Sequence, residues 1–257
     1  MRLDKYLHDL GFGSRKEIDH LLARRQVTVD GARVKKGATQ VKPESVVAID
    51  GELLVYAPTV WLMLNKPAGV ITATEDARHE TVMDLLPERF ARMQVAPVGR
   101  LDKDTEGLLL LTDDGALAHD LLAPKKHVDK VYFVRTDGAL DDADCKAFVQ
   151  GIERFMDAME GEKYTALFLA EPVSNETQAA IRRSEALITI REGKFHQIKR
   201  MLASRGKPVV YLKRLSMGSL TLDEGLSKGE YRLLTAEEIK NLRESGQFAQ
   251  GKAGADK

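Results

Sequence analysis

The chain lacks the usual marks of a secreted or membrane protein. Only one of its 257 residues is a cysteine, Cys145, so no disulfide can form within the chain. No apolar run approaches the roughly 20 residues needed to span a bilayer, and the N-terminus shows no secretory signal pattern. A lone cysteine fits a reducing compartment. These absences predict a cytoplasmic protein with no membrane association.

The chain also lacks net charge, but its charges are segregated. It contains 39 basic residues (Lys and Arg) and 39 acidic ones. Eight basic residues lie between positions 15 and 42 against three acids, and eight more lie between 191 and 214 against one acid. A charge run is often only a solvated face. Two such runs in a neutral chain nevertheless favour a polyphosphate partner, because each neutralised phosphate releases counterions.

Residues 1–50 have the pattern of a separate small module. A helix is expected over residues 2–10, with four apolar side chains on one face: Leu3, Tyr6, Leu7 and Leu10. Ser14 and Glu17 have the spacing of a capping box that begins a second helix. Residues 27–34 alternate around Asp30 and Gly31, which predicts a β-hairpin.

The rest of the chain has the pattern of a larger α+β domain. We expect a linker at 51–59, this domain at 60–243 and a disordered polar tail at 244–257. Strands are expected at 61–64, 108–112, 131–135 and 187–190, with a loop at 65–69. Helices are expected at 116–122, 141–150 and 197–204.

The segment 98–115 contains the most informative motif, Gly-Arg-Leu-Asp, in which Asp102 precedes an apolar strand. Asp102, Asp104 and Glu106 also imitate the first, third and fifth positions of a calcium loop. That interpretation fails because Asp113 occupies the twelfth position, where a bidentate Glu is needed. The preceding segment, 95–98, is also too short and proline-broken to be an entering helix. We therefore treat Asp102 as a candidate nucleophile on a loop.

Four motifs, in order, resemble the ribosomal pseudouridine synthases of the RsuA type. They are Asn65-Lys66-Pro67, Gly99-Arg100-Leu101-Asp102 with Thr105-x-Gly107-Leu108, Lys130-Val131-Tyr132, and the run from Glu192 to Met201. The first module resembles the S4 RNA-binding domain through Arg2-Leu3-Asp4-Lys5 and Val27-Thr28-Val29-Asp30-Gly31. The resemblance covers nearly the whole chain. It implies an α+β fold, with a small S4-like α/β module followed by a mixed, mainly antiparallel sheet flanked by helices.

The resemblance implies an enzyme that isomerises a uridine to pseudouridine in ribosomal RNA, with no cofactor and no metal. Its closest motifs favour the small-subunit branch, and hence uridine 516 of 16S rRNA. Two alternatives stay open: a synthase for the large-subunit 23S rRNA, and a non-catalytic rRNA-binding assembly factor. The expected partner is ribosomal RNA within a pre-ribosomal particle, and the protein is expected to be a monomer.

The resemblance also assigns catalytic roles. Asp102 would engage the sugar or the base as the nucleophile, and a nearby cation would keep it ionised. Lys199 matches the position of that cation, with Arg200 as the reserve choice; both could instead only bind phosphates. Tyr132 would stack on the flipped-out base, or could be an ordinary core aromatic of its strand.

Other residues are expected to contact RNA. Arg100 would fill the space that the flipped base vacates. Met217 would either form an apolar floor under the base or, as the commoner role of such a residue, pack in the core. His196 and Gln197 would lie beside the cation without acting as catalysts. The remaining expected RNA-binding residues share a positive charge and lie in the two basic runs: Arg15, Lys16, Arg24, Arg25, Arg33, Lys35, Lys194 and Arg200.

Overall fold

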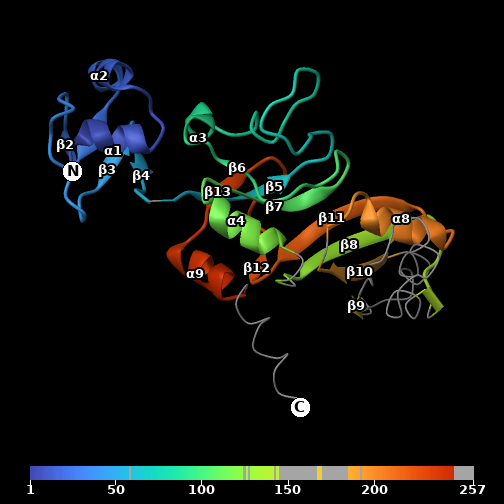
Figure 1. Cartoon of the computed structure of the whole chain (residues 1–257). Coiled ribbons are helices and arrows are strands. Elements are labelled where there is room, and N and C mark those ends of the chain that lie inside the picture. Colours follow the sequence, from blue (N-terminus) through green and yellow to red (C-terminus); the bar gives the residue numbers. More distant parts are fainter. Residues whose placement is uncertain are drawn as a thin grey trace, which may run out of the picture.

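The computed structural model has two modules joined by one connection. It describes residues 1–57, 59–123, 126, 128–141, 143–144, 167–169, 185–191 and 193–245. We call residues 1–57 the N-terminal module and residues 59–245 the C-terminal module. In Figure 1 the N-terminal module lies apart on the left, and the C-terminal module extends away from it to the right. No helix among these residues has the length and apolar character needed to cross a bilayer.

Two helices and a four-stranded antiparallel sheet form the N-terminal module. The elements are α1 (Leu3–Asp9), α2 (Arg15–Arg24), β1 (Val27–Val29), β2 (Ala32–Arg33), β3 (Val47–Ile49) and β4 (Glu52–Leu54). The capping box is present, with reciprocal bonds between Ser14 and Glu17. Asp30 and Gly31 both have positive φ, as a tight hairpin turn requires. The predicted helix pair and hairpin are therefore confirmed.

The expected linker begins later than position 51. Residues Glu52–Leu54 form β4, which pairs with β3 through a tight turn at Asp50 and Gly51. Leu54 is buried in the core of the N-terminal module, and the Tyr6 hydroxyl donates to its carbonyl. The strand was missed because it is only three residues long, and a long-range contact with α1 secures it.

In the C-terminal module, the described residues form a nine-stranded sheet. The strand order is β13-β5-β7-β11-β8-β10-β9, with β12 beside β11 and β6 beside β7. Among the strand pairs of the described residues, β11 and β7 are the one parallel pair. The strands are β5 (Trp61–Lys66), β6 (Ala96–Pro97), β7 (Glu106–Thr112), β8 (Lys130–Thr136), β9 (Leu167–Leu169), β10 (Glu185–Ile190), β11 (Val209–Met217), β12 (Leu220–Thr221) and β13 (Tyr231–Leu233). This is the mixed, mainly antiparallel α+β domain that was predicted.

Apolar cores cover both faces of this sheet. The helices are α3 (Glu88–Arg92), α4 (Gly115–Leu122), α8 (Gln197–Ser204) and α9 (Ala236–Ser245). α3 and α8 contribute side chains to one core, and α4 and α9 to the other. Strand β7 serves both: Leu109 and Leu111 enter the first core, while Leu108 and Leu110 enter the second. A continuous apolar run suits a strand that is buried on both faces.

Several boundaries differ from the sequence-based predictions. β5 continues through Asn65 and Lys66, which had been placed in a loop. Helix α9 extends through Ser245, so the first two residues of the expected tail are helical. The predicted helix at 141–150 lies mostly outside the described residues, as does Cys145. Strands β11 and β13 were not predicted, because charged residues interrupt their alternation.

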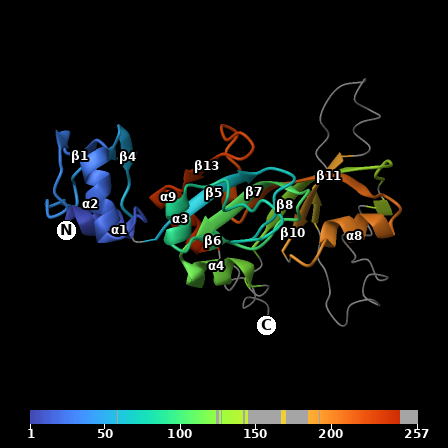
Figure 2. The ribbon, with the colours of Figure 1, turned by 90° about the horizontal axis from the view of Figure 1, so that it is seen from above.

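Helix α3 of the C-terminal module packs against the N-terminal module. Arg92 forms an ion pair with Glu17 at 3.5 Å, and the guanidinium of Arg89 lies 5.4 Å from the centre of the Phe12 ring. Gly11 lies so close to the backbone of α3 that a Cβ at this position would be 2.3 Å from the carbonyl oxygen of Arg89. In Figure 2 the N-terminal module lies at one end of the molecule and α8 lies toward the other.

Candidate active site

A hollow opens where the loop before β7, strand β8, the end of β10 and the start of α8 meet. About 390 Å³ of space lies between its lining side chains, with the open solvent at its mouth included. Its lining consists of Arg100, Leu101, Asp102, Thr105, Tyr132, Ile190, Gly193, Lys194, His196, Gln197, Ile198, Lys199 and Leu212. Segments as distant in sequence as residues 100 and 212 thus form one site.

The loop that carries Asp102 is held by neighbours on both sides. The Leu101 amide donates to the Thr72 hydroxyl oxygen at 3.2 Å, and that hydroxyl donates to the Leu101 carbonyl at 2.9 Å. Beyond the loop, Gly107 has a φ of +99°, and a Cβ there would lie 2.2 Å from the carbonyl oxygen of Arg214. Glycine is therefore required where β7 begins.

Lys66 braces the same loop from beneath. Its side chain is fully buried, and its ammonium donates to the carbonyls of Pro67, Lys103 and Thr105 at 2.9, 3.3 and 3.0 Å. Burial lowers the pKa of Lys66 to about 8, against the opposing charges of Asp104 and Asp102. Sequence reasoning identified the motif but not this bracing function, because two of the carbonyl partners lie almost forty residues away.

Asp102 faces Lys199 across the hollow. Lys199 Nζ lies 2.9 Å from Asp102 Oδ2 and 2.5 Å from Asp104 Oδ1. His196 Nε2 lies 3.5 Å from the other oxygen of Asp102. Burial alone would lower the pKa of Lys199, but its hydrogen bonds to Asp104 and Asp102 outweigh burial and raise it. Lys199 therefore stays charged beside a carboxylate that is 25% exposed.

The neighbouring basic residues occupy different positions. Arg100 is exposed and lines the hollow, and Lys194 is half-buried and also lines it. Arg200, the reserve choice for the cation, is half-buried on α8 and does not line the hollow. Consecutive helical residues point about 100° apart, so only one of Lys199 and Arg200 can face Asp102. It is Lys199.

Tyr132 belongs both to the hollow and to the core. Strand β8 alternates so that Tyr132 and Val134 are buried on one face, while Val131 and Phe133 lie on the other. The Tyr132 hydroxyl accepts a hydrogen bond of 3.4 Å from Arg214 Nη1. The interpretations of Tyr132 as a core aromatic and as a site residue are therefore compatible.

Arg214 is a buried cation that was not singled out from the sequence. Arg214 is only 2% exposed, and its Nε donates a hydrogen bond to the Leu108 carbonyl at 2.7 Å. Its Nη2 is buried and makes no hydrogen bond within the described structure. Nearby Lys130 is also buried, which lowers its pKa to about 8, with the charge of Arg214 adding to the effect. Arg214 thus contacts Tyr132 directly, and Lys130 lies two residues before Tyr132 on β8.

Met217 packs in a core and not under the base, which is the commoner of its two expected roles. It is fully buried in the core to which α4 and α9 contribute, and it does not line the hollow. Leu212, Ile190 and Ile198 line the hollow instead. His196 and Gln197 do lie beside the cation, as expected.

The basic residues of the N-terminal module are exposed, away from the hollow. Arg15 forms an ion pair with Asp4 at 3.3 Å, and Arg25 forms one with Asp50 at 2.6 Å. The others in this exposed set are Lys16, Arg24, Arg33 and Lys35. Since α8 lies toward the opposite end of the molecule (Figure 2), an RNA that touches both sets has to extend along the protein.

The three carboxylates of the calcium-loop pattern do not converge. Asp102 and Asp104 share Lys199, whereas Glu106 accepts from Tyr211 and Lys228, each at 2.8 Å. Within the described part of the chain, no three acidic, His or Cys side chains are grouped as metal ligands.

Comparison with known proteins bears on both modules. A model of the RNA pseudouridylate synthase family matches residues 60–204, and a model of the S4 domain matches residues 1–47. YtzG of Bacillus subtilis (strain 168), an uncharacterized RNA pseudouridine synthase, is 45% identical over 95% of this chain and 99% of its own. Ribosomal small subunit pseudouridine synthase A of Yersinia pestis is 38% identical, over 94% of this chain and 98% of its own.

Comparison with solved structures gives the same result as comparison with these relatives. A crystal structure of a pseudouridylate synthase superposes with a TM-score of 0.61 and 32% identity, covering 94% of this chain and 99% of the other. The family model covers more than half of the chain, and the relatives cover nearly all of it. The chain therefore belongs to the RNA pseudouridylate synthase family, as an isomerase with an S4 RNA-binding domain at its N-terminal end.

Proposed function

We propose that this enzyme isomerises one uridine of the small-subunit 16S rRNA, uridine 516, by flipping it out and attacking it with Asp102. The relatives named ribosomal small subunit pseudouridine synthase A, from Yersinia pestis and Escherichia coli (strain K12), support the small-subunit target. The observation that carries the mechanism is the Asp102–Lys199 pair, 2.9 Å apart at the edge of the hollow.

The reaction needs a carboxylate that is ionised and reachable. The N1–C1′ bond of uridine breaks, a C5–C1′ bond forms, C5 loses its proton and N1 gains one. Asp102 is partly exposed to the hollow, and the ammonium of Lys199 lies 2.9 Å from its carboxylate. Such a carboxylate can form a covalent intermediate, as carboxylates do in glycosidases. Lys199 then acts as the cation that positions and neutralises it.

The hollow suits a single extruded base. Flipping costs roughly a few kcal/mol of unstacking, which contacts made after extrusion have to offset. Tyr132 offers an aromatic face, and Leu212 and Ile190 offer apolar walls. Arg100, exposed at the edge, would occupy the gap that the base leaves in the RNA, where a planar guanidinium can stack and donate hydrogen bonds.

The N-terminal module would hold folded RNA away from the reacting base. Its exposed basic side chains contact phosphates, so this grip depends on RNA shape rather than on sequence. We place Lys194 and Arg200 in the same phosphate-binding role beside the hollow. The substrate would be rRNA in a pre-ribosomal particle, bound by a monomeric enzyme in the cytoplasm.

The test uses RNA with uridine tritiated at C5, because pseudouridine formation releases that hydrogen. Purified protein should release tritium from a 16S fragment, and carbodiimide-stop mapping should find the product at one position. Asp102→Asn should abolish release but keep RNA affinity. Asp104→Asn is the matched control: it changes a carboxylate of the same loop that contacts the same lysine, and it should keep most activity.

Each alternative has its own outcome. Turnover by Asp102→Asn would refute the nucleophile. Activity on 23S rather than 16S RNA would overturn the target while keeping the chemistry. RNA binding without isomerisation by the wild-type protein would favour the assembly factor.

A further inference from the structure

Phe195 is exposed although the residues on both sides of it line the hollow. Phe195 is 74% exposed, and this exposed fraction is the largest among the large apolar residues that the structure describes. Lys194 and His196 both line the hollow, whereas Phe195 does not, so it stands on the rim. An isolated exposed apolar side chain is usually unremarkable. This one differs because of how its ring is held.

The ring of Phe195 packs against its neighbour in the turn before α8. It stacks on the ring of His196, with centroids 3.8 Å apart and planes 17° apart. The turn beneath is closed twice: the Gln197 amide donates to the Lys194 carbonyl, and the Lys194 amide donates to Gln197 Oε1, both at 3.1 Å. His196 itself adopts a left-handed φ of +50°, which turns the chain into α8.

One side of the Phe195 ring is therefore covered by imidazole, and the residue remains largely open to solvent. An exposed aromatic face beside positive charge is the feature by which proteins stack unpaired bases of RNA. The charge is supplied by Lys194 beside Phe195 and by Arg100 in the lining of the same hollow. These cations favour a polyanion over a protein or lipid surface.

We propose that Phe195 is a stacking platform for an unpaired nucleobase next to the flipped uridine. This inference rests on the proposed function of the hollow as the uridine site. The target uridine enters the hollow, and a flanking base, which loses its stacking neighbour when the uridine leaves, stacks on Phe195. The stack then runs from RNA base to Phe195 to His196, whose Nε2 lies 3.5 Å from Asp102. Phe195 therefore adds affinity for the flipped state without touching the reacting atoms.

The direct test places 2-aminopurine at a nucleotide flanking the target uridine in a 16S fragment. Stacking on an aromatic ring changes its fluorescence, so wild-type protein should give a signal that Phe195→Ala lacks and Phe195→Tyr keeps. Loss of one base stack should raise the Kd for RNA roughly 5- to 150-fold. The kcat at saturating RNA should not change.

Val210→Ala is the matched control, since Val210 is 61% exposed on the same module. It should leave fluorescence, Kd and kcat at wild-type values. Urea unfolding of Phe195→Ala should also match wild type, because the side chain is so exposed.

The possible failures are distinguishable. If wild type and Phe195→Ala give the same fluorescence change and the same Kd, the platform is refuted while the proposed function stands. If the wild-type protein releases no tritium from the RNA, the proposed function is refuted, whatever the fluorescence shows. If Phe195→Ala lowers kcat at saturating RNA with an unchanged Kd, Phe195 acts on the chemistry and the stacking proposal is wrong.

Discussion

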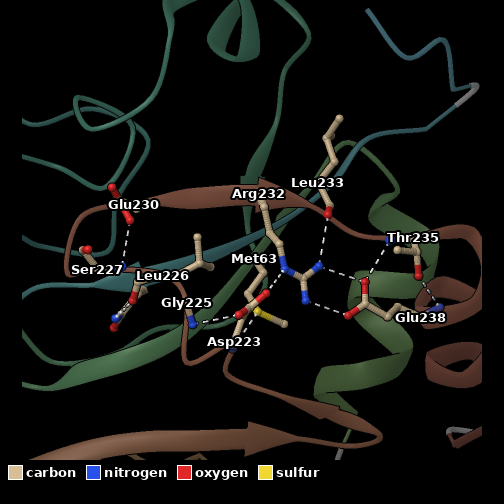
Figure 3. A network of polar contacts seen from close by, with 11 residues as sticks. Met63, Asp223, Gly225, Leu226, Ser227, Glu230, Arg232, Leu233, Thr235 and Glu238 are labelled. Atoms are coloured by element: carbon tan, nitrogen blue, oxygen red, sulfur yellow. Dashed lines mark hydrogen bonds and ion pairs between the residues drawn. The ribbon is translucent and has the colours of Figure 1, made fainter. Parts of the chain in front are cut away.

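Replacing Glu238 by glutamine should remove a part of the stability that depends on pH. Figure 3 shows Arg232 of β13 held between Asp223 and Glu238. Arg232 Nε lies 2.6 Å from Asp223, and its two terminal nitrogens lie 2.9 and 2.8 Å from the two oxygens of Glu238. The Thr235 amide also donates to Glu238 at 2.8 Å. The network ties the edge strand of the sheet to α9.

The size of the effect follows from the pKa of Glu238. The hydrogen bonds that Glu238 accepts from Arg232 lower this pKa most, and the bond from the Thr235 amide lowers it further. Burial acts in the opposite direction, and the net pKa falls from 4.5 to about 2. Each pKa unit corresponds to about 1.4 kcal/mol, so the shift gives an upper limit of about 3 kcal/mol for the contribution of Glu238 to stability. The Glu238 side chain is 26% exposed, and solvent screening reduces the expected contribution to about 2 kcal/mol.

The sign of the pH dependence is determined by the direction of the shift. A lowered carboxyl pKa stabilises the folded state fully above the unfolded value of 4.5, and this stabilisation is lost as pH falls toward 2. Urea unfolding, followed by the fluorescence of the single tryptophan, Trp61, should show Glu238→Gln less stable than wild type at pH 7. The difference should shrink steadily below pH 4.5.

Glu237→Gln is the control, because it removes the same charge from the exposed neighbouring position in the first turn of α9. Its stability should stay within about 0.5 kcal/mol of wild type. A Glu238→Gln deficit that is constant from pH 7 to pH 3 would refute the reasoning, since it would then come from packing and not from charge.

Two further predictions concern RNA and catalysis. Replacing Arg33 and Lys35 together by glutamine should weaken RNA binding and make the slope of log K against log salt shallower by about 1.8; an unchanged slope measured by filter binding would mean that neither contacts phosphate. Arg214→Met and Tyr132→Phe should each lower kcat, and the double variant should depart from additivity by roughly 0.5–3 kcal/mol, because Arg214 donates to the Tyr132 hydroxyl. Additive effects in single-turnover assays would show that Arg214 does not act through Tyr132.

Short-range patterns predicted the N-terminal module well. The capping box at Ser14 and the turn at Asp30 are decided by residues within three or four positions of each other. β4 escaped prediction because Leu54 is buried by contacts with α1, almost fifty residues away. Local propensity carries no information about such a partner.

The burial of three cations at the site was the main feature that the sequence did not predict. Lys66, Lys130 and Arg214 look like surface residues in the sequence, yet each is buried and donates to backbone carbonyls. Arg214 reaches the carbonyl of Leu108, more than a hundred residues earlier. The pairing of β11 with β7 and β8 brings Arg214 to Leu108 and Tyr132, and the pairing of β5 with β7 places Lys66 beside the loop.

By itself the sequence determined the two modules, their local caps and turns, and the motifs that resemble the family, because these depend on residue types at short spacing. Tertiary structure decided which basic residue meets Asp102, since the direction of α8 turns Lys199 toward it. It also placed Met217 in the opposite core and left Phe195 open on the rim. These outcomes depend on how distant strands pair and how a helix is rotated, and such long-range geometry is set only when the whole chain packs.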